Sequence, residues 1–211
     1  MKPAILCLLS GGVDSTGALH QLITNDQYQG FDLIVHHINI VNRERRALAE
    51  SQAVKNILNY YVDHLQAQFI YTESTSDTTG FAPLQSKRFP FDMDICTFMA
   101  ANLVAAYPAI SKIVRGRTKT DLEGADTSYV KRTARTKSIL ESVIMFDAIE
   151  TPEYLFPVID FTKEEIWNFL PEPVKQHTWW CRHPQYDENK NAKPCGVCPT
   201  CKQMAQITTI K

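Results

Sequence analysis

Two hydrophobic patterns alternate along the chain. Short apolar runs predict buried strands, and they occupy residues 4–9, 32–40, 68–71, 110–114 and 154–159. Between them, apolar residues recur every three or four positions, as on one face of a helix; these segments follow residue 16 and cover 44–65, 92–107, 139–144 and 162–170. The alternation predicts an α/β fold of the Rossmann-like kind, with a mostly parallel sheet covered by helices on both faces.

Local signals refine this layout. The polar stretch 72–80 has no periodicity and predicts a loop. Pro157 cannot donate to a strand ladder, so the last apolar run is expected at an edge or at a strand end. Thr162-Lys163-Glu164-Glu165 predicts a capping box at the start of the final helical segment.

Length and composition limit the class of protein. The 211 residues suffice for one substantial domain, expected over 1–175, with a small C-terminal element over 176–211 packed on it. No apolar run approaches the length of a membrane span, and glycines interrupt the N-terminal apolar stretch before a signal-peptide core forms. We therefore expect no membrane partner and a cytoplasmic location. A net charge of −1 argues against a surface that binds nucleic acid as a whole.

The junction between the first apolar run and the first helical segment is the most informative part of the chain. Ser10-Gly11-Gly12-Val13-Asp14-Ser15-Thr16 follows directly on the run 4–9. Two glycines permit positive φ and close backbone approach, so successive N–H groups can point into one concavity, to which the helix adds its positive dipole end. This pattern favours a phosphate-binding loop over an ordinary Gly-Gly corner. It lacks the lysine of a Walker A loop and the G-x-G-x-x-G of dinucleotide folds.

The cysteines fall into two groups. Cys7 and Cys96 lie in apolar segments and are expected as small core residues. Four others crowd into the last 31 residues, with Cys181 preceding a C-x-x-C-x-x-C run of Cys195, Cys198 and Cys201. Four clustered thiolates predict a closed tetrahedral Zn²⁺ site that pins a poorly structured tail, 184–193, to the domain. A redox or iron–sulfur centre and free thiols in a disordered tail are the alternatives.

Both end motifs together point to a known family. The S-G-G-x-D-S loop resembles that of PP-loop ATP pyrophosphatases, which cleave ATP between its α and β phosphates. With the distal cysteine followed by C-G-x-C-P-x-C, the chain resembles the 7-cyano-7-deazaguanine synthase family. Supporting features are His36-His37 at the expected end of the second strand, Thr120-Asp121, and Pro157 ahead of Lys163-Glu164-Glu165.

The resemblance implies an adenine nucleotide alpha hydrolase-like fold and a PP-loop ATP pyrophosphatase domain over 1–175. It implies a ligase that uses ATP, Mg²⁺ and ammonia, in which Zn²⁺ is structural. The enzyme would adenylate the carboxylate of 7-carboxy-7-deazaguanine, form the amide, and dehydrate it to the nitrile, with AMP and pyrophosphate as by-products. The small-molecule deazapurine requires no nucleic acid, and the family analogy suggests a homodimer.

The chain departs from the family in its middle. The family's P-G-R-N-like segment is replaced by Phe89-Pro90-Phe91-Asp92-Met93-Asp94, and the segment 115–126 is altered too. The exact acceptor therefore stays open, since a divergent member would stop at the amide or activate another carboxylate.

Three sets of site residues follow from these motifs. The predicted catalytic residues are Ser10, Asp14, Ser15 and Lys163. The predicted nucleotide-binding residues are Leu9, Ser10, Gly11, Gly12, Val13, Asp14, Ser15, Thr16, His37, Arg115 and Gly116, and the predicted substrate-binding residues are Arg117, Thr120, Asp121 and Asp126.

Several of these residues have a plain structural alternative. Asp14 either binds Mg²⁺ and orders the loop or only favours the helix start. Asp121 and Asp126 either accept hydrogen bonds from a guanine-like ring edge or cap a turn. Lys163 either reaches the phosphates or faces solvent. For Trp179 and Trp180, packing over the metal element is favoured over base stacking.

Two other functions compete with the ligase. A PP-loop enzyme that modifies tRNA would need a catalytic thiol, for which Cys96 is the sensible candidate, or an added RNA-binding domain. A catalytically silent nucleotide-binding or zinc module is the other; the basic residues between Lys112 and Lys137 support it, and the intact loop argues against it.

Overall fold

The computed structural model describes residues 2–81, 83, 91–123, 127–145 and 150–209. Five parallel strands form one sheet in the order β3-β2-β1-β4-β5. They are β1 (Ala4–Leu8), β2 (Asp32–Val41), β3 (Ile70–Asp77), β4 (Ile110–Val114) and β5 (Glu153–Leu155). Because β1 lies in the centre, Cys7 pairs with Val35 on one side and Val114 on the other. The predicted Rossmann-like parallel sheet is confirmed.

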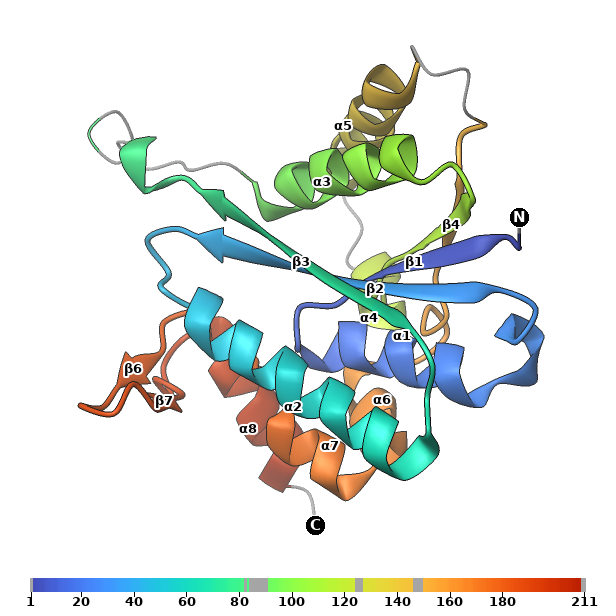
Figure 1. Ribbon diagram of the computed structural model, residues 1–211. Helices are drawn as coiled ribbons and strands as arrows, with labels where there is room; N and C mark the ends of the chain where they lie inside the picture. Colours follow the sequence, from blue (N-terminus) through green and yellow to red (C-terminus); the bar gives the residue numbers. More distant parts are fainter. Residues whose placement is uncertain (1, 82, 84–90, 124–126, 146–149, 210–211) are drawn as a thin grey trace.

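Helices cover both faces of this sheet (Figure 1). On one face lie α1 (Val13–Thr24), α2 (Ala47–Leu65), α6 (Lys163–Phe169), α7 (Glu172–His177) and α8 (Pro199–Thr209); on the other lie α3 (Asp92–Ala106) and α5 (Thr127–Ile144). Side chains of β1 alternate between the two layers: Ile5 and Cys7 pack toward α1 and α2, whereas Ala4 and Leu6 pack toward α3 and α5. The short helix α4 (Lys119–Glu123) and the turns η1 (Asp26–Tyr28) and η2 (Thr79–Phe81) complete the list.

Strand β3 corrects the predicted loop over 72–80. It runs to Asp77 and pairs with β2 without interruption, from Ile34 opposite Ile70 to Val41 opposite Asp77. β3 is an edge strand, so polar side chains can face solvent while the backbone pairs. Strand β2 runs from Asp32 to Val41, so His36 and His37 lie in its middle rather than at its end.

The fifth strand is shorter than the predicted run 154–159, whereas α6 (Lys163–Phe169) matches the predicted helical segment. β5 ends at Leu155, two residues before Pro157, which has no N–H for the ladder. The Thr162–Glu165 capping box is present, with both reciprocal hydrogen bonds, and it starts α6 at Lys163. None of the helices in the described part of the chain combines the length and apolar character that a membrane crossing requires.

The C-terminal element is ordered, contrary to the predicted loose tail. Gln185–Tyr186 (β6) and Ala192–Lys193 (β7) form an antiparallel hairpin. Helix α8 follows, and its Met204 is buried in the same core cluster as Ile5 and Cys7 of β1. The element therefore shares the core of the sheet domain.

Candidate functional site

The loop 10–16 forms a tight turn between β1 and α1. Gly11 has φ of +76°, and a Cβ there would lie 2.9 Å from the Cβ of Ala53, so only glycine fits. The Oγ of Ser15 lies 3.0 Å from the Oγ of Ser10 and donates to the Gly12 carbonyl at 3.2 Å. The two hydroxyls therefore sit together at the N-terminus of α1, as a phosphate-binding nest requires.

A second turn presses against this loop from β4. A Cβ on Gly116 would lie 2.7 Å from both the carbonyl carbon of Asp14 and the nitrogen of Ser15. These are backbone atoms, so a side chain at Gly116 would displace the loop itself. The ends of β1 and β4 therefore define one rigid edge of the site.

Asp14 forms an ion pair at this edge. Its Oδ2 lies 3.0 Å from the Nζ of Lys163, which α6 carries at its first residue. Burial raises the pKa of Asp14, and the ammonium of Lys163 opposes that shift. In the described part of the chain, neither Asp14 Oδ1 nor Thr16 Oγ1 has a hydrogen-bond partner, although both atoms are buried. Asp14 also lines the adjacent cavity, and a buried polar atom left without a partner there is typical of a site completed by a ligand.

A cavity of about 260 Å³ opens beside the loop, over the carboxyl ends of the strands. Loop residues form one side of it, and β2 and α3 provide apolar walls through Ile38, Ile40, Met93 and Cys96. Cys96, expected in the core, thus lines the cavity. Its burial raises the pKa of its thiol to about 12.

Arg115 supplies an uncompensated positive charge to this cavity. It is 7% exposed, and its guanidinium donates to three neutral hydroxyls, Thr97 at 2.8 Å, Tyr154 at 3.1 Å and Thr136 at 3.4 Å. No carboxylate among the described residues forms an ion pair with it. Burial lowers the pKa of Arg115, which is the electrostatic sign of a cation without a counter-ion. The ligand of this cavity is therefore expected to bring negative charge.

The four C-terminal cysteines come together as predicted. Their sulfur atoms all lie within 4.8 Å of one another, and three of the four residues are buried. The backbone N–H of Cys195 donates to the sulfur of Cys181 at 3.1 Å, and N–H donors of Val197 and Cys198 lower the pKa of Cys195. Burial raises the pKa values of Cys181 and Cys201, so the feature that favours one shared metal ion is the closeness of the four sulfurs.

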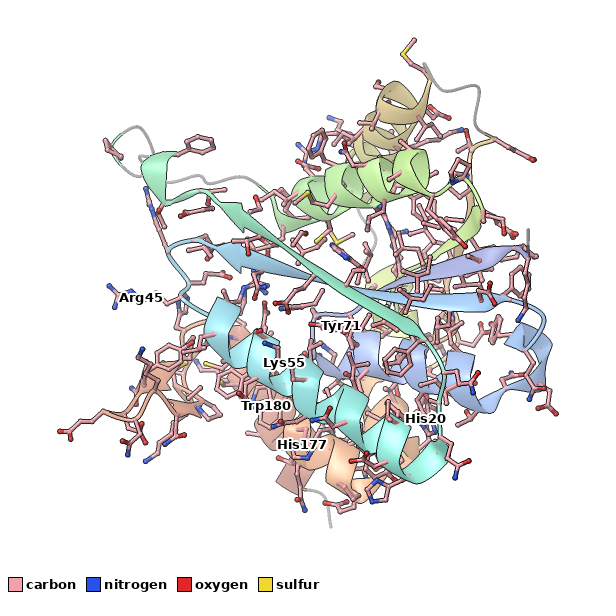
Figure 2. The ribbon with its side chains drawn as sticks, in the orientation of Figure 1. His20, Arg45, Lys55, Tyr71, His177 and Trp180 are labelled. Carbon is pink, nitrogen blue, oxygen red and sulfur yellow. The ribbon has the colours of Figure 1, made fainter. Side chains whose placement is uncertain are left out.

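The cluster is attached to the loop 10–16. The backbone N–H of Trp179 donates to the Gly11 carbonyl at 2.8 Å, and its indole N–H donates to the Cys181 carbonyl at 2.9 Å. Trp180 packs edge-on against Trp167 at 6.0 Å, and Figure 2 shows it beside α2, on the same side of the sheet as the C-terminal element. Packing of both indoles around the cysteines is confirmed.

Comparison with known proteins agrees with this geometry. The family model for the queuosine biosynthesis protein QueC matches residues 4–207. The chain belongs to the QueC family.

Two solved structures are similar to this QueC-family chain. The U34-tRNA thiolase NcsA from Methanococcus maripaludis, with its [4Fe-4S] cluster, superposes with a TM-score of 0.52 at 12% identity, over 99% of this chain and 64% of the thiolase chain. An NMN synthetase from Francisella tularensis gives a TM-score of 0.45 at 11% identity, over 82% of this chain and 64% of its own. The chain thus spans about two thirds of the length of these structures. No match was found among curated protein sequences.

Not every predicted nucleotide-binding residue of this QueC-family chain faces the cavity. Those that line it are Leu9, Ser10, Gly12, Asp14, Ser15, Arg115 and Gly116, whereas Gly11, Val13, Thr16 and His37 do not. His37 is fully buried on the α1–α2 side, and its Nδ1 lies 2.8 Å from the Leu9 carbonyl. Successive strand residues face opposite sides, so His36 lines the cavity instead, held by Thr72 and Ser74 at 2.8 and 2.9 Å.

Three of the predicted substrate-binding residues, Arg117, Thr120 and Asp121, lie outside the cavity lining. Asp121 accepts hydrogen bonds from the backbone N–H and hydroxyl of Thr118 at 2.9 and 3.1 Å, so it caps α4, as the alternative had it. Arg117 lies over the ring of Phe156 at 5.3 Å, and Thr120 is exposed on α4. Asp126 lies outside the described residues.

The sequence did not reveal a charged network that also borders the cavity. It joins Glu44, Arg46 and Glu50 from the start of α2 to Asp92 of α3 and Arg182 of the C-terminal element. Arg46 and Glu50, four positions apart at a helix start, were the available signal. Asp92 lies in the segment that departs from the family pattern.

Proposed function

We propose that this chain is an ATP-dependent ligase that forms AMP and pyrophosphate. It adenylates the carboxylate of 7-carboxy-7-deazaguanine and adds ammonia, giving the amide, the nitrile 7-cyano-7-deazaguanine, or both in turn. The observation that carries the proposal is the cavity itself. One wall is the Ser10–Ser15 loop, and beside it lies the buried Arg115 without a carboxylate partner among the described residues.

The first step is attack of a substrate carboxylate oxygen on the α-phosphorus of ATP. The new bond joins that oxygen to phosphorus, the bond to the bridging oxygen breaks, and pyrophosphate leaves with the electron pair. Negative charge grows on the leaving group, where the backbone N–H groups and the hydroxyls of Ser10 and Ser15 stabilise it. Arg115 neutralises the anionic reactants, and Lys163 remains close through Asp14.

In the second step, the lone pair of ammonia attacks the activated carbonyl carbon. The bond from this carbon to the adenylate oxygen breaks, AMP leaves, and one proton is lost from nitrogen to give the amide. Conversion to the nitrile repeats the activation on the amide oxygen with a second ATP and releases two protons. The apolar walls at Ile38, Met93 and Cys96 exclude water, which would otherwise hydrolyse the adenylate.

Two metal ions belong to the proposal. Asp14 Oδ1, buried without a partner among the described residues, fits a role in holding Mg²⁺, which neutralises phosphate charge when bound. The four cysteines fit Zn²⁺: bonds of about 2.3 Å to one ion put tetrahedral sulfurs roughly 3.8 Å apart, and the spread here is at most 4.8 Å. A cubane spreads its ligands over four irons and needs a wider ring, so the geometry supports zinc over an iron–sulfur cluster.

The test is to incubate the protein with ATP, Mg²⁺, ammonium and 7-carboxy-7-deazaguanine and to follow products by mass. We expect AMP together with the amide or nitrile. AMP formed only with tRNA would instead support a tRNA-modifying enzyme, and absence of AMP under every condition would support a silent binding module.

Arg115 provides a residue-level test. Arg115→Met removes the uncompensated cation, and a hydrogen bond to a charged group contributes about 1.5–3 kcal/mol, so kcat/KM should fall roughly 10- to 100-fold. Arg117→Met is the matched control, because Arg117 lies outside the cavity lining and should stay within about twofold of wild type.

A further inference from the structure

The charged network that borders the cavity is centred on Arg46. Its Nε lies 2.7 Å from Glu44 Oε2, one terminal nitrogen lies 2.8 Å from Glu50 Oε1, and the other contacts Asp92 Oδ2. Arg182 adds contacts to Glu44 Oε1 at 2.8 Å and to Asp92 Oδ2 at 3.3 Å. Three carboxyl groups thus share two guanidinium groups.

Two of these carboxylates line the cavity with an oxygen to spare. Asp92 Oδ1 is buried and has no hydrogen-bond partner in the part of the chain that the structure describes. Glu50 is 7% exposed; its Oε1 accepts from Arg46, and no described residue donates to its Oε2. An unsatisfied buried acceptor such as Asp92 Oδ1 is expensive, so this part of the cavity is suited to a ligand that donates hydrogen bonds.

The surroundings indicate what kind of donor fits. Ile38, Ile40 and Met93 line the same cavity as the acidic network and the loop, and they suit the flat faces of a ring. Mg²⁺ keeps several waters and prefers phosphate oxygens, so this apolar setting disfavours it. The cavity therefore has an anion-binding end at Arg115 and the loop, apolar walls, and a hydrogen-bond-accepting end.

We propose that Asp92 and Glu50 determine base specificity by accepting the ring N–H and the exocyclic amino hydrogens of a guanine-like 2-aminopyrimidinone edge. This inference rests on the proposed function and assigns the ring-recognising residues of the same site. A guanine-like edge presents two adjacent N–H donors, which match carboxylate acceptors. An adenine-like edge presents a ring-nitrogen lone pair beside its amino group, and that lone pair would face a carboxylate oxygen.

The test compares Asp92→Asn with Asp94→Asn. Both aspartates lie in the first turn of α3, but Asp94 pairs with Arg135 and does not line the cavity. In Asp92→Asn, the new side-chain amide must turn its NH₂ either toward Arg46 or toward the ring donors. Glu50→Gln is the second variant, and circular dichroism establishes that each protein folds. Calorimetry measures binding of 7-carboxy-7-deazaguanine, of its analogue without the 2-amino group, and of ATP.

Wild type should bind the 2-amino compound at least ~10-fold more tightly than the analogue, as loss of one or two charged hydrogen bonds implies. Asp92→Asn and Glu50→Gln should weaken deazapurine binding about 10- to 100-fold and lose this preference. ATP affinity should stay within about threefold, and Asp94→Asn should match wild type.

Wild-type affinity and preference in both folded variants would overturn the inference while leaving the ligase proposal intact, provided AMP still forms. A changed Mg²⁺ dependence of nucleotide binding with an unchanged ring preference would assign the carboxylates to a cation and likewise overturn it. If wild type neither binds nor converts the deazapurine, the proposed function fails, and this inference falls with it.

Discussion

The loop end and the acidic end of the cavity lining consist of different chemical groups. At the loop end, backbone N–H groups, two serine hydroxyls and the Asp14–Lys163 pair surround an edge set by glycines. At the acidic end, long side chains from three separate segments interlock around Arg46. Backbone donors complement any phosphate chain, whereas a carboxylate network discriminates between ring edges. Under the proposed function, phosphate chemistry and substrate selection therefore depend on different residues of one small cavity.

The C-terminal element is the common support of both ends. Trp179 donates to the Gly11 carbonyl of the loop, and Arg182, the residue after Cys181, contacts Glu44 and Asp92 of the network. Disturbing the cysteines should therefore affect both ends at once, while other changes should affect one end alone.

Removal of the metal is expected to have the largest effect. Structural zinc contributes about 10 kcal/mol or more in zinc-finger peptides; here the sheet has its own core, so we expect a loss of roughly 5 kcal/mol. At about 2–4 °C per kcal/mol, the melting temperature should fall by about 10–20 °C. Differential scanning calorimetry before and after chelation, with metal analysis, provides the measurement.

The matched variants are Cys181→Ser and Cys96→Ser. The first should lose the metal and weaken both ATP and deazapurine binding, because it loosens Trp179 and Arg182 together. The second should keep one metal ion per chain, since Cys96 lies apart from the cluster in α3. A chelated protein with unchanged stability and binding would show that the element does not support the cavity.

The second prediction concerns a variant that displaces the loop end alone. In Gly116→Ala the new Cβ meets the backbone of Asp14 and Ser15 at 2.7 Å, so the loop must move. A displacement of this kind in phosphate-binding geometry should lower AMP formation about 100-fold or more, with deazapurine binding nearly unchanged. Gly30→Ala is the control, because nothing lies within 4 Å of its added Cβ. Equal activity of the two variants would contradict the close contact.

The sequence predicts best those parts of the structure that are determined by a few neighbouring residues. The loop 10–16, the capping box at Thr162 and the cysteine run each lie within a few consecutive residues whose chemistry is set locally, so the sequence alone indicates them. The periodicity misses strand β3 beyond Tyr71, because its polar residues pair with β2 through backbone groups that no side-chain pattern records.

The acidic end shows the limit most clearly. Its members at positions 44, 46, 50, 92 and 182 meet only because α2, α3 and the cysteine element converge at one end of the sheet. The sequence favours Asp121 and Asp126 for the guanine-edge role, since both are acidic and near a strand end; Asp121 in fact caps α4. Residue type indicates the chemistry needed, but only topology shows which carboxylates line the cavity.

The third prediction concerns the pH dependence of the acidic end. Burial raises the pKa of Glu50 to about 7, above its ordinary value of 4.5, so the folded protein holds this proton more tightly than the unfolded chain. Stability from this group is therefore full below about pH 4.5 and is lost as pH rises through 7. A pKa difference of this size corresponds to on the order of 3 kcal/mol.

Other groups make a direct reading of this curve misleading. Burial lowers the pKa values of His36 and His37, so their contributions rise with pH and oppose that of Glu50. The informative quantity is the difference in unfolding free energy between wild type and Glu50→Gln, measured by urea denaturation at about pH 5 and about pH 8, on either side of the folded-state pKa. The unfolding free energy of Glu50→Gln should increase relative to that of wild type as pH rises. Parallel curves of unfolding free energy against pH would mean that burial does not raise the pKa of Glu50.

The smallest effect is expected at the loop end, from Thr162→Ala. The Thr162 hydroxyl accepts the Glu165 N–H at 3.2 Å, so its loss removes the cap of α6 and about 1 kcal/mol of stability, or roughly 2–4 °C in melting temperature. Lys163 begins that helix, but its ion pair with Asp14 also holds it from the other side, so AMP formation should fall less than about threefold. Thr24→Ala removes a hydroxyl that, among the described residues, bonds to the His20 carbonyl alone, and it should change stability by under ~0.5 kcal/mol. If Thr162→Ala instead reduced AMP formation as strongly as Gly116→Ala, the position of Lys163 would matter as much as the backbone of the loop. The loop end would then depend on side-chain placement, as the acidic end does.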